Sequence, residues 1–137
     1  MAHEKFPVEV LTPEGKVFDD EVEQVSTRTA VGSIGVLAHH EPVLAMLDPA
    51  ELRLYRSETE VVRFAQAEGY MQFAENRLLL LVEEAHPPEE LDVSQLRDRL
   101  QEAERRLEEA GEDTEKQRTA QRDVSRWQRF LQIAEGS

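Results

Sequence analysis

The last third of the chain has two runs of apolar residues with the spacing of an α-helix. Between residues 91 and 134, apolar side chains recur at alternating steps of four and three, which places them on one face of a helix. A short polar segment at 111–114 separates the runs and leaves room only for a turn. The pattern therefore predicts an antiparallel two-helix hairpin. We expect its apolar seam to contain Leu96, Leu100, Ala103, Leu107 and Ala110 on the first helix and Ala120, Val124, Trp127, Leu131 and Ala134 on the second.

Each predicted helix has its own start signal. Asp92 with Gln95, and Thr114 with Gln117, have the spacing of capping boxes, in which the first side chain accepts a hydrogen bond from a backbone N–H three residues on. Gly111 can adopt the left-handed conformation that ends the first helix. We therefore expect Asp92 and Thr114 to be the N-caps.

Residues 6–82 follow a different pattern, with short apolar bursts separated by turn residues. Alternation of apolar and polar positions, as at 51–56, is typical of strands with one buried face. Residues 78–82 are apolar at every position, which predicts a strand covered on both faces. Gly32 and Gly35 predict a tight turn and a close backbone approach. The sequence thus predicts an all-β part of about eight to ten short strands, a β-sandwich or flattened barrel, before the helical hairpin.

Two adjacent prolines, Pro87 and Pro88, mark the boundary between these parts. Proline cannot continue a central strand and holds the chain extended, so we expect a stiff spacer here. The predicted domains are a β-sandwich at 1–86, a linker at 87–91 and a helical hairpin at 92–137.

The chain is strongly acidic, with 29 Asp and Glu against 16 Lys and Arg and a formal net charge of −13. This charge repels phosphate backbones and anionic headgroups, so we expect no nucleic-acid partner and no direct insertion into lipid. No apolar run approaches the roughly 20 residues that span a bilayer, and the start lacks the features of a signal peptide. The composition predicts a protein that is cytosolic or at most peripheral to a membrane.

Few residues are candidates for chemistry. The chain has no cysteine, and its four histidines are either adjacent, as His39 and His40 are, or isolated in a tail and a linker, as His3 and His86 are. We therefore expect no metal site. No pattern pairs a nucleophile with a base, and no acidic pair has neighbours that would separate its two pKa values. The sequence indicates that the protein is not an enzyme.

Three segments resemble a known family. Residues 32–42 read GSIGVLAHHEP, which is similar to the Gly-x-x-Gly-Val/Ile-Leu-Pro-x-His-x-Pro stretch of the epsilon subunit of bacterial F-type ATP synthases, with Ala38 in place of the proline. Residues 11–15 (LTPEG) and residues 68–73 (EGYMQF) add to the resemblance, the latter being similar to the family's Gly-Gly-Phe-x-Glu-Val. The order and spacing of these segments, with the hairpin, extend the resemblance over the whole chain.

This resemblance implies a non-catalytic rotor subunit in the central stalk of a proton-translocating ATP synthase, peripheral on the cytoplasmic face of the bacterial plasma membrane. In that family the sandwich binds the gamma subunit and rests on the membrane rotor ring. The hairpin can extend along gamma toward the catalytic alpha/beta ring and inhibit ATP hydrolysis. The resemblance leads us to expect that the loop at 31–42 contacts gamma or the ring through Ser33, Ile34 and His40, with Ile34 as an exposed apolar side chain.

Some bacterial members of the family also bind ATP in the hairpin. They use a Leu/Ile-Asp-x-x-Arg-Ala motif on the first helix and arginines on the second. Leu91 and Asp92 match this motif and Gln95 replaces its arginine, while on the second helix Arg126 matches one arginine and Phe130 replaces the next. Asp92 and Arg126 are thus the nucleotide-binding candidates. Because most of the charge partners for ATP are missing, we expect no cofactor and interpret Asp92 as an N-cap.

A second hypothesis uses the same seam. The chain could be a free-standing acidic adaptor whose hairpin pairs with helices of a partner. Residues 32–42 distinguish the two hypotheses, since an adaptor does not need this stretch.

Overall fold

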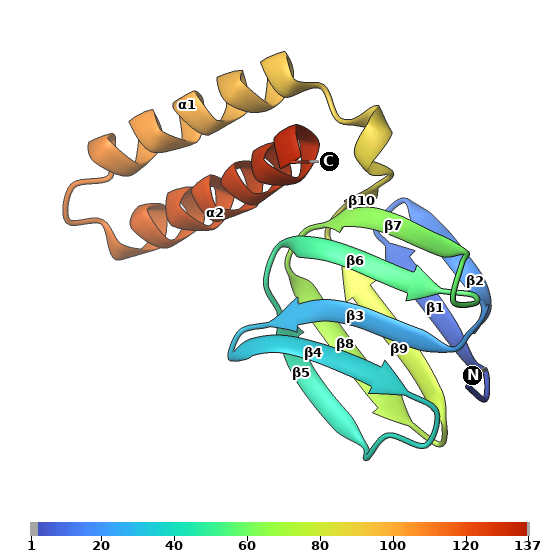
Figure 1. The fold of residues 1–137 in the computed structure, drawn as a ribbon. Coiled ribbons are helices and arrows are strands. Elements are labelled where there is room, and N and C mark those ends of the chain that lie inside the picture. The colour runs from blue at the N-terminus through green and yellow to red at the C-terminus, as the bar shows by residue number, and fades with distance from the viewer. Residues whose placement is uncertain (1–2, 137) are drawn as a thin grey trace. The chain divides into compact units, whose positions relative to one another are not determined.

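The structure, a computed structural model, describes residues 3–136 and divides into two compact units between Pro87 and Pro88 (Figure 1). The strands are β1 (Phe6–Thr12), β2 (Gly15–Val22), β3 (Gln24–Thr29), β4 (Gly32–Leu37), β5 (Val43–Leu47), β6 (Ala50–Tyr55), β7 (Val61–Gln66), β8 (Gly69–Ala74), β9 (Arg77–Val82) and β10 (Ala85–His86). The helices are the 3₁₀-helix η1 (Pro88–Glu90), α1 (Val93–Glu109) and α2 (Thr114–Gly136). The predicted fold class, a β-sandwich followed by a helical hairpin, is confirmed.

The strands form a single sheet that folds over on itself. Its order is β10-β7-β6-β3-β5-β8-β9-β1-β2, and β4 pairs with β3 beside this path. β1 and β9 run parallel, with Val8 opposite Leu78 and Val10 opposite Leu80. In Figure 1, β3, β6 and β7 form one layer in front of β1, β8 and β9. The two layers enclose one hydrophobic core.

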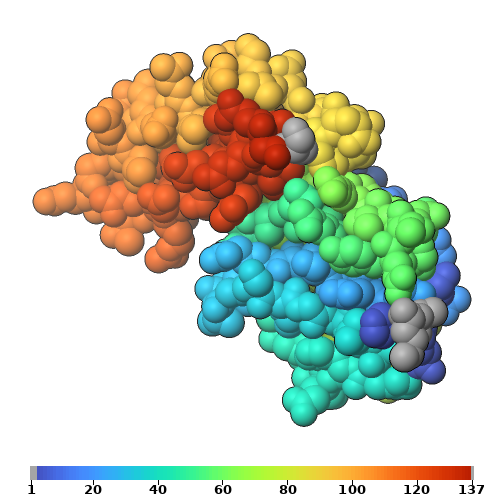
Figure 2. Space-filling view, in the orientation of Figure 1, coloured from blue at the N-terminus to red at the C-terminus, as the bar shows by residue number. Residues whose placement is uncertain are grey.

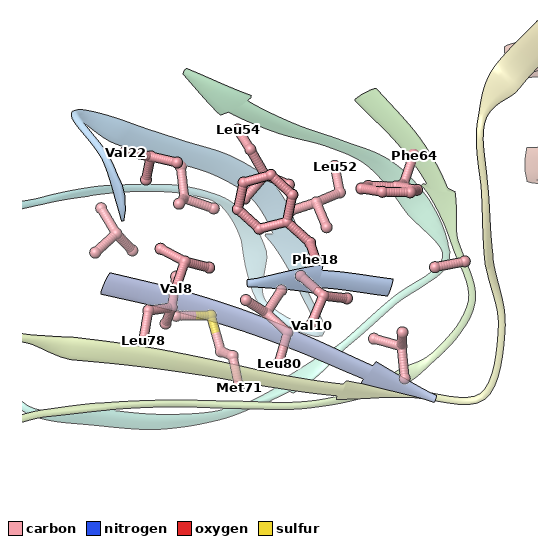
Figure 3. Close-up of a cluster of buried hydrophobic side chains, with 14 of the residues drawn as sticks. Val8, Val10, Phe18, Val22, Leu52, Leu54, Phe64, Met71, Leu78 and Leu80 are labelled. Carbon is pink, nitrogen blue, oxygen red and sulfur yellow. The ribbon is translucent and has the colours of Figure 1, made fainter. Parts of the chain in front are cut away.

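Alternation along each strand fills this core. On β1, Phe6, Val8 and Val10 have no exposed surface, while the residues between them are half-buried. Burying a side chain of this kind contributes roughly 1.5 to 3 kcal/mol. Other members of the cluster come from both layers and include Leu52, Leu54, Phe64, Met71, Leu78 and Leu80 (Figure 3).

One polar side chain, Gln66 at the end of β7, is also completely buried. Its Oε1 accepts a hydrogen bond from the Thr27 hydroxyl on β3 at 2.6 Å, and its Nε2 donates to the backbone carbonyl of Asp48 at 2.8 Å. A buried amide is costly unless it is hydrogen-bonded, so this geometry holds Gln66 in one position. The network therefore fixes β3 relative to β7.

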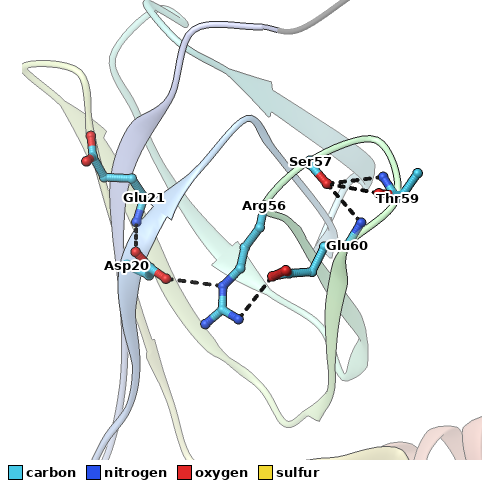
Figure 4. Close-up of polar contacts among 6 residues, drawn as sticks. All are labelled: Asp20, Glu21, Arg56, Ser57, Thr59 and Glu60. Atoms are coloured by element: carbon cyan, nitrogen blue, oxygen red, sulfur yellow. Dashed lines mark hydrogen bonds and ion pairs between the residues drawn. The ribbon is translucent and has the colours of Figure 1, made fainter.

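Arg56, which follows β6, links the end of that strand to the edge strand β2 (Figure 4). Its guanidinium lies 5.4 Å from the centre of the Phe18 ring, and its Nε is 3.1 Å from the Asp20 carboxylate. Its Nη1 is 3.4 Å from Glu60, and Ser57 closes the intervening turn by accepting a hydrogen bond from the N–H of Glu60. Each exposed ion pair contributes at most about 1 kcal/mol, but together these contacts tie β2 to β6.

The chain around the two prolines is more ordered than a simple spacer. Ala85 and His86 form β10, which pairs with β7, and Ala85 belongs to the core. Pro88 then begins η1, so the expectation that both prolines hold the chain extended is wrong. Proline fits the first position of a helix because its missing N–H is not needed there.

The caps of the hairpin match the sequence at one helix and differ at the other. The Asp92 side chain accepts a hydrogen bond from the N–H of Gln95 at 3.1 Å, as predicted. At α2 the capping side chain is Asp113, which accepts from the N–H of Lys116, so the prediction of Thr114 is wrong by one residue. Both residues are good N-caps, and the spacing to a later glutamine favoured the wrong one.

The two helices pack along an apolar seam. Leu100, Leu107 and Leu131, which the pattern also predicts there, are only half-buried. Phe130 and Ile133 were not predicted to belong to the seam and are buried. Steps of three and four both fit the helical period, so the spacing could not choose between Phe130 and Leu131. The buried residues that the pattern does predict are Leu96, Ala103, Ala110, Ala120, Val124 and Trp127.

Trp127 is the centre of a stack within the hairpin. The guanidinium of Arg99 on α1 lies 5.0 Å from the ring centre, that of Arg126 lies 5.3 Å from it, and the Phe130 ring meets it edge-on at 5.8 Å. Cation–π contacts of this kind contribute about 0.5 to 2 kcal/mol. Two ion pairs also join the helices, Arg106 with Asp123 at 2.9 Å and Arg97 with Glu135 at 2.7 Å.

Candidate interaction surface

Four large apolar side chains project from adjacent strands of the sandwich into solvent. Leu44 and Met46 on β5 are 74% and 60% exposed, Tyr70 on β8 is 53% exposed, and Leu81 on β9 is 47% exposed. The ladder places Met46 opposite Tyr70 and Tyr70 opposite Leu81, so these residues are neighbours. With the half-buried Leu11 and Leu79, they form a surface that we call the outer face.

The outer face contradicts one prediction from the sequence. The apolar run at 78–82 is covered on one side only, because Leu78, Leu80 and Val82 point into the core while Leu79 and Leu81 point outward. The prediction that both faces of this strand are covered is therefore wrong for the chain alone. A soluble protein that leaves a contiguous apolar surface of this kind usually binds a partner there.

Charged residues border the outer face on β1 and β2. Glu9 lies opposite Leu79 in the ladder and Asp19 lies opposite Glu9. Lys16 is 2.9 Å from Asp19 and 3.2 Å from Glu9. Hydrogen bonds from Lys16 to these two carboxylates raise the pKa of its ammonium group, Asp19 having the larger effect. The surface thus changes from apolar to charged between Leu79 on β9 and Glu9 on β1.

Ser33, Ile34 and His40 do not form one loop, because β4 occupies most of the segment between 31 and 42. Figure 2 shows β4 and the β3–β4 turn, in light blue to cyan, at the surface. Ser33 is exposed, whereas Ile34 is half-buried against the core, so the expectation that Ile34 is an exposed apolar residue is wrong. His40 follows the other end of β4, and its ring meets Phe73 edge-on at 5.8 Å.

The most exposed apolar residue of this segment is Val31, which is 99% exposed in the turn between β3 and β4. Thr29 holds the turn, because its hydroxyl donates to the carbonyl of Gly32 at 2.9 Å and accepts from the N–H of Val31 at 3.2 Å. Gly32 has a φ of 137°, as expected for a tight turn, but Gly35 makes no close backbone approach. Such an approach occurs at Gly69, where an added Cβ would lie 2.0 Å from the carbonyl oxygen of Leu81.

The two nucleotide-binding candidates are placed differently. The carboxylate of Asp92 caps α1, and Arg126 is buried against Trp127. Within residues 3–136, no group of three or more His, Asp or Glu side chains could hold a metal ion. No helix in the same range is long and apolar enough to cross a bilayer.

A sandwich with an uncovered apolar face, joined to a helical hairpin, is typical of the class of proteins that work by binding a partner through that face. Comparison with known proteins identifies the family. Residues 5–88 match the model of the ATP synthase Delta/Epsilon chain β-sandwich domain. The chain therefore belongs to the ATP synthase epsilon chain family, as the resemblance implied, and it is a non-catalytic subunit of ATP synthase.

Individual relatives support this assignment along most of the chain. The chain is 40% identical to the ATP synthase epsilon chain of Persephonella marina over 104 residues, 76% of each chain. It is 32% identical to that of Halalkalibacterium halodurans over 127 residues, 93% of this chain and 95% of the relative.

Solved structures share the fold. A chain of the Euglena gracilis mitochondrial ATP synthase matches with a TM-score of 0.76 at 20% identity, over 92% of this chain and 79% of that chain. A chain of the Tetrahymena thermophila mitochondrial ATP synthase matches with a TM-score of 0.68 at 17% identity, over 98% and 99%.

Proposed function

We propose that this chain couples the gamma subunit to the membrane rotor ring, and that the outer face is its binding surface for gamma. The observation that carries the proposal is the row Met46, Tyr70 and Leu81, whose side chains are about half exposed or more on adjacent strands. Covering side chains exposed to this degree would contribute on the order of 1 to 2 kcal/mol each. Together with Leu44, they supply the apolar centre that a stable protein interface needs.

A second surface would meet the rotor ring. Val31 projects from the turn that Thr29 closes, and Ser33 follows on β4. An apolar residue at the tip of a turn can insert into a shallow groove between neighbouring subunits of the ring, and little conformational entropy is lost when it does so. His40, at the other end of β4, extends the candidate contact area. With this placement the subunit is peripheral on the cytoplasmic face of the bacterial plasma membrane.

The hairpin is the regulatory element of the proposal. It would extend toward the catalytic alpha/beta ring and inhibit ATP hydrolysis, and arginines on its exposed surface would favour acidic partner segments. Contacts within the hairpin support this role, because Arg99, Arg106 and Arg97 on α1 each contact α2 and hold the two helices together. Because its two helices pack against each other, the hairpin would remain helical when its surroundings change. Because Asp92 already caps α1, the switch would work without ATP as a ligand.

A test of the outer face uses the full-length chain and the gamma subunit of the same organism. Tyr70→Asp and Leu81→Asp should each weaken binding to gamma at least about 10-fold, because each buries a charge in an apolar interface. The matched control is Leu37→Asp, which changes an apolar residue that is 42% exposed on β4. Equal binding by all three variants would contradict the proposal.

Co-purification separates the proposal from the adaptor hypothesis. A tagged chain should be recovered from its native cells with ATP synthase subunits. Recovery with unrelated proteins, without any ATP synthase subunit, would favour the free-standing adaptor.

A further inference from the structure

The turn between β1 and β2 separates two hollows at the end of the outer face. The first hollow, of about 290 Å³, adjoins Tyr70 and Leu81 and is mainly apolar. Its remaining walls are formed by Leu11, Thr12, Pro13, Gly69, Val82 and Glu83. Leu11 lies opposite Leu81 in the parallel ladder, so this hollow continues the outer face toward the turn.

The second hollow, also of about 290 Å³, shares Thr12 and Glu83 with the first and is acidic. Its basic side chains are already engaged, since Lys16 is held by Glu9 and Asp19, and His86 lies 2.8 Å from Glu84. The remaining carboxylates here are those of Glu14 and Glu83. Among the contacts of residues 3–136, neither carboxylate has an ion-pair partner.

We propose that these hollows form a two-part docking site for the stalk partner, which inserts one apolar side chain beside Tyr70 and places a neighbouring Lys or Arg beside Glu14 and Glu83. The inference rests on the proposed function and specifies the chemistry of the partner segment at this end of the interface. A hollow binds a protruding side chain better than a flat apolar surface does, because the hollow encloses more of that side chain. The unpaired carboxylates supply the charge complementarity that fixes the register of the segment.

Leu11→Trp tests the apolar hollow. The substitution keeps the outer face apolar but fills the space that the partner's side chain needs, so we expect binding to gamma to weaken about 10-fold. Leu37→Trp is the matched control, because it adds the same bulk at an exposed apolar residue of β4 outside both hollows and should bind like the parent chain. Thermal unfolding of both variants checks that each is folded.

The double substitution Glu14→Gln and Glu83→Gln tests the acidic hollow. We expect association with gamma at low salt to slow about three- to tenfold, and its salt dependence to become smaller, because exposed charges act mainly on the association rate. Glu58→Gln in the β6–β7 turn is the control for a general change in charge.

Comparison with Tyr70→Asp distinguishes failure of the docking site from failure of the proposed function. If Tyr70→Asp abolishes binding while Leu11→Trp and the glutamine pair bind like the parent at both salt concentrations, the docking site is overturned and the proposed function stands. If Tyr70→Asp also binds like the parent, the outer face itself is not the gamma-binding surface.

Discussion

Tyr70 on β8 lies directly opposite Leu81 on β9, and both side chains point away from the core. Their strand neighbours Met71 and Leu80 point inward and are almost completely buried. The same two strands thus supply both the core of the sandwich and the apolar outer face. A change on one side can therefore be separated experimentally from a change on the other.

Gly69 is a position at which only glycine fits. Gly69→Ala would place a Cβ 2.0 Å from the carbonyl oxygen of Leu81, so β8 and β9 must move apart. We expect the free energy of unfolding to fall by about 3 kcal/mol, measured by urea denaturation. Gly35→Ala is the control, since its Cβ would meet only Gln24 Nε2 at 3.9 Å, and it should change the stability by less than about 0.5 kcal/mol. Equal stability of the two variants would show that the close backbone approach at Gly69 does not require glycine.

Gln66→Ala should destabilise the sandwich through both lost hydrogen bonds and a cavity. The substitution leaves the Thr27 hydroxyl and the Asp48 carbonyl without the partner they have here, and we expect a loss of about 2 to 4 kcal/mol. The exposed Gln72→Ala on β8 is the control and should change stability by about 0.5 kcal/mol or less. If urea denaturation gave the two variants the same midpoint, the buried network would have no structural role.

Trp127 is the only tryptophan of the chain, so its fluorescence reports on the hairpin. Arg99→Gln removes one of the two guanidiniums over the ring and should lower the free energy of hairpin unfolding by about 0.5 to 1 kcal/mol. Arg118→Gln, an exposed change on α2, should leave the fluorescence transition unchanged. A transition that responds equally to both changes would contradict a specific role for the stack.

The sequence predicts the helices and strands well where the apolar residues follow one clear repeat. It predicts less well which residues are buried or act as caps, because side-chain contacts determine this. The helical period identified the hairpin and most of its buried residues, but Phe130 competes with Leu131 for the same seam, and contact with Trp127 is invisible in spacing. Asp113 and Thr114 are both good capping residues, so local preference could not choose between them.

The candidate site was only partly predictable. The family resemblance predicts contact residues within 32–42, including Ile34, which is half-buried. It does not predict Val31, which is exposed. The signal for the outer face was present in the uninterrupted apolar run at 78–82. That run was interpreted as a strand covered within the chain, because a sequence alone does not tell a buried face from a face that awaits a partner.

Removal of residues 88–137 tests the regulatory role of the hairpin. Assembled ATP synthase containing the truncated chain should hydrolyse ATP faster than the intact enzyme, with assembly largely retained, because the contacts of the outer face remain. The assay requires low salt, which preserves any attraction between the arginines of the hairpin and acidic partner segments. An unchanged rate at matched assembly would leave the hairpin a structural element only.

The oxidation rates of two methionines show whether the outer face is an interface within ATP synthase. Met46 is 60% exposed on the outer face, and Met71 on the adjacent strand is 1% exposed in the core. In the free chain, hydrogen peroxide should convert Met46 to the sulfoxide at least about tenfold faster than Met71, as followed by mass spectrometry. In the assembled ATP synthase, Met46 should become nearly as protected as Met71. Oxidation of Met46 at the same rate in the free and the assembled protein would show that the outer face is not an interface within ATP synthase.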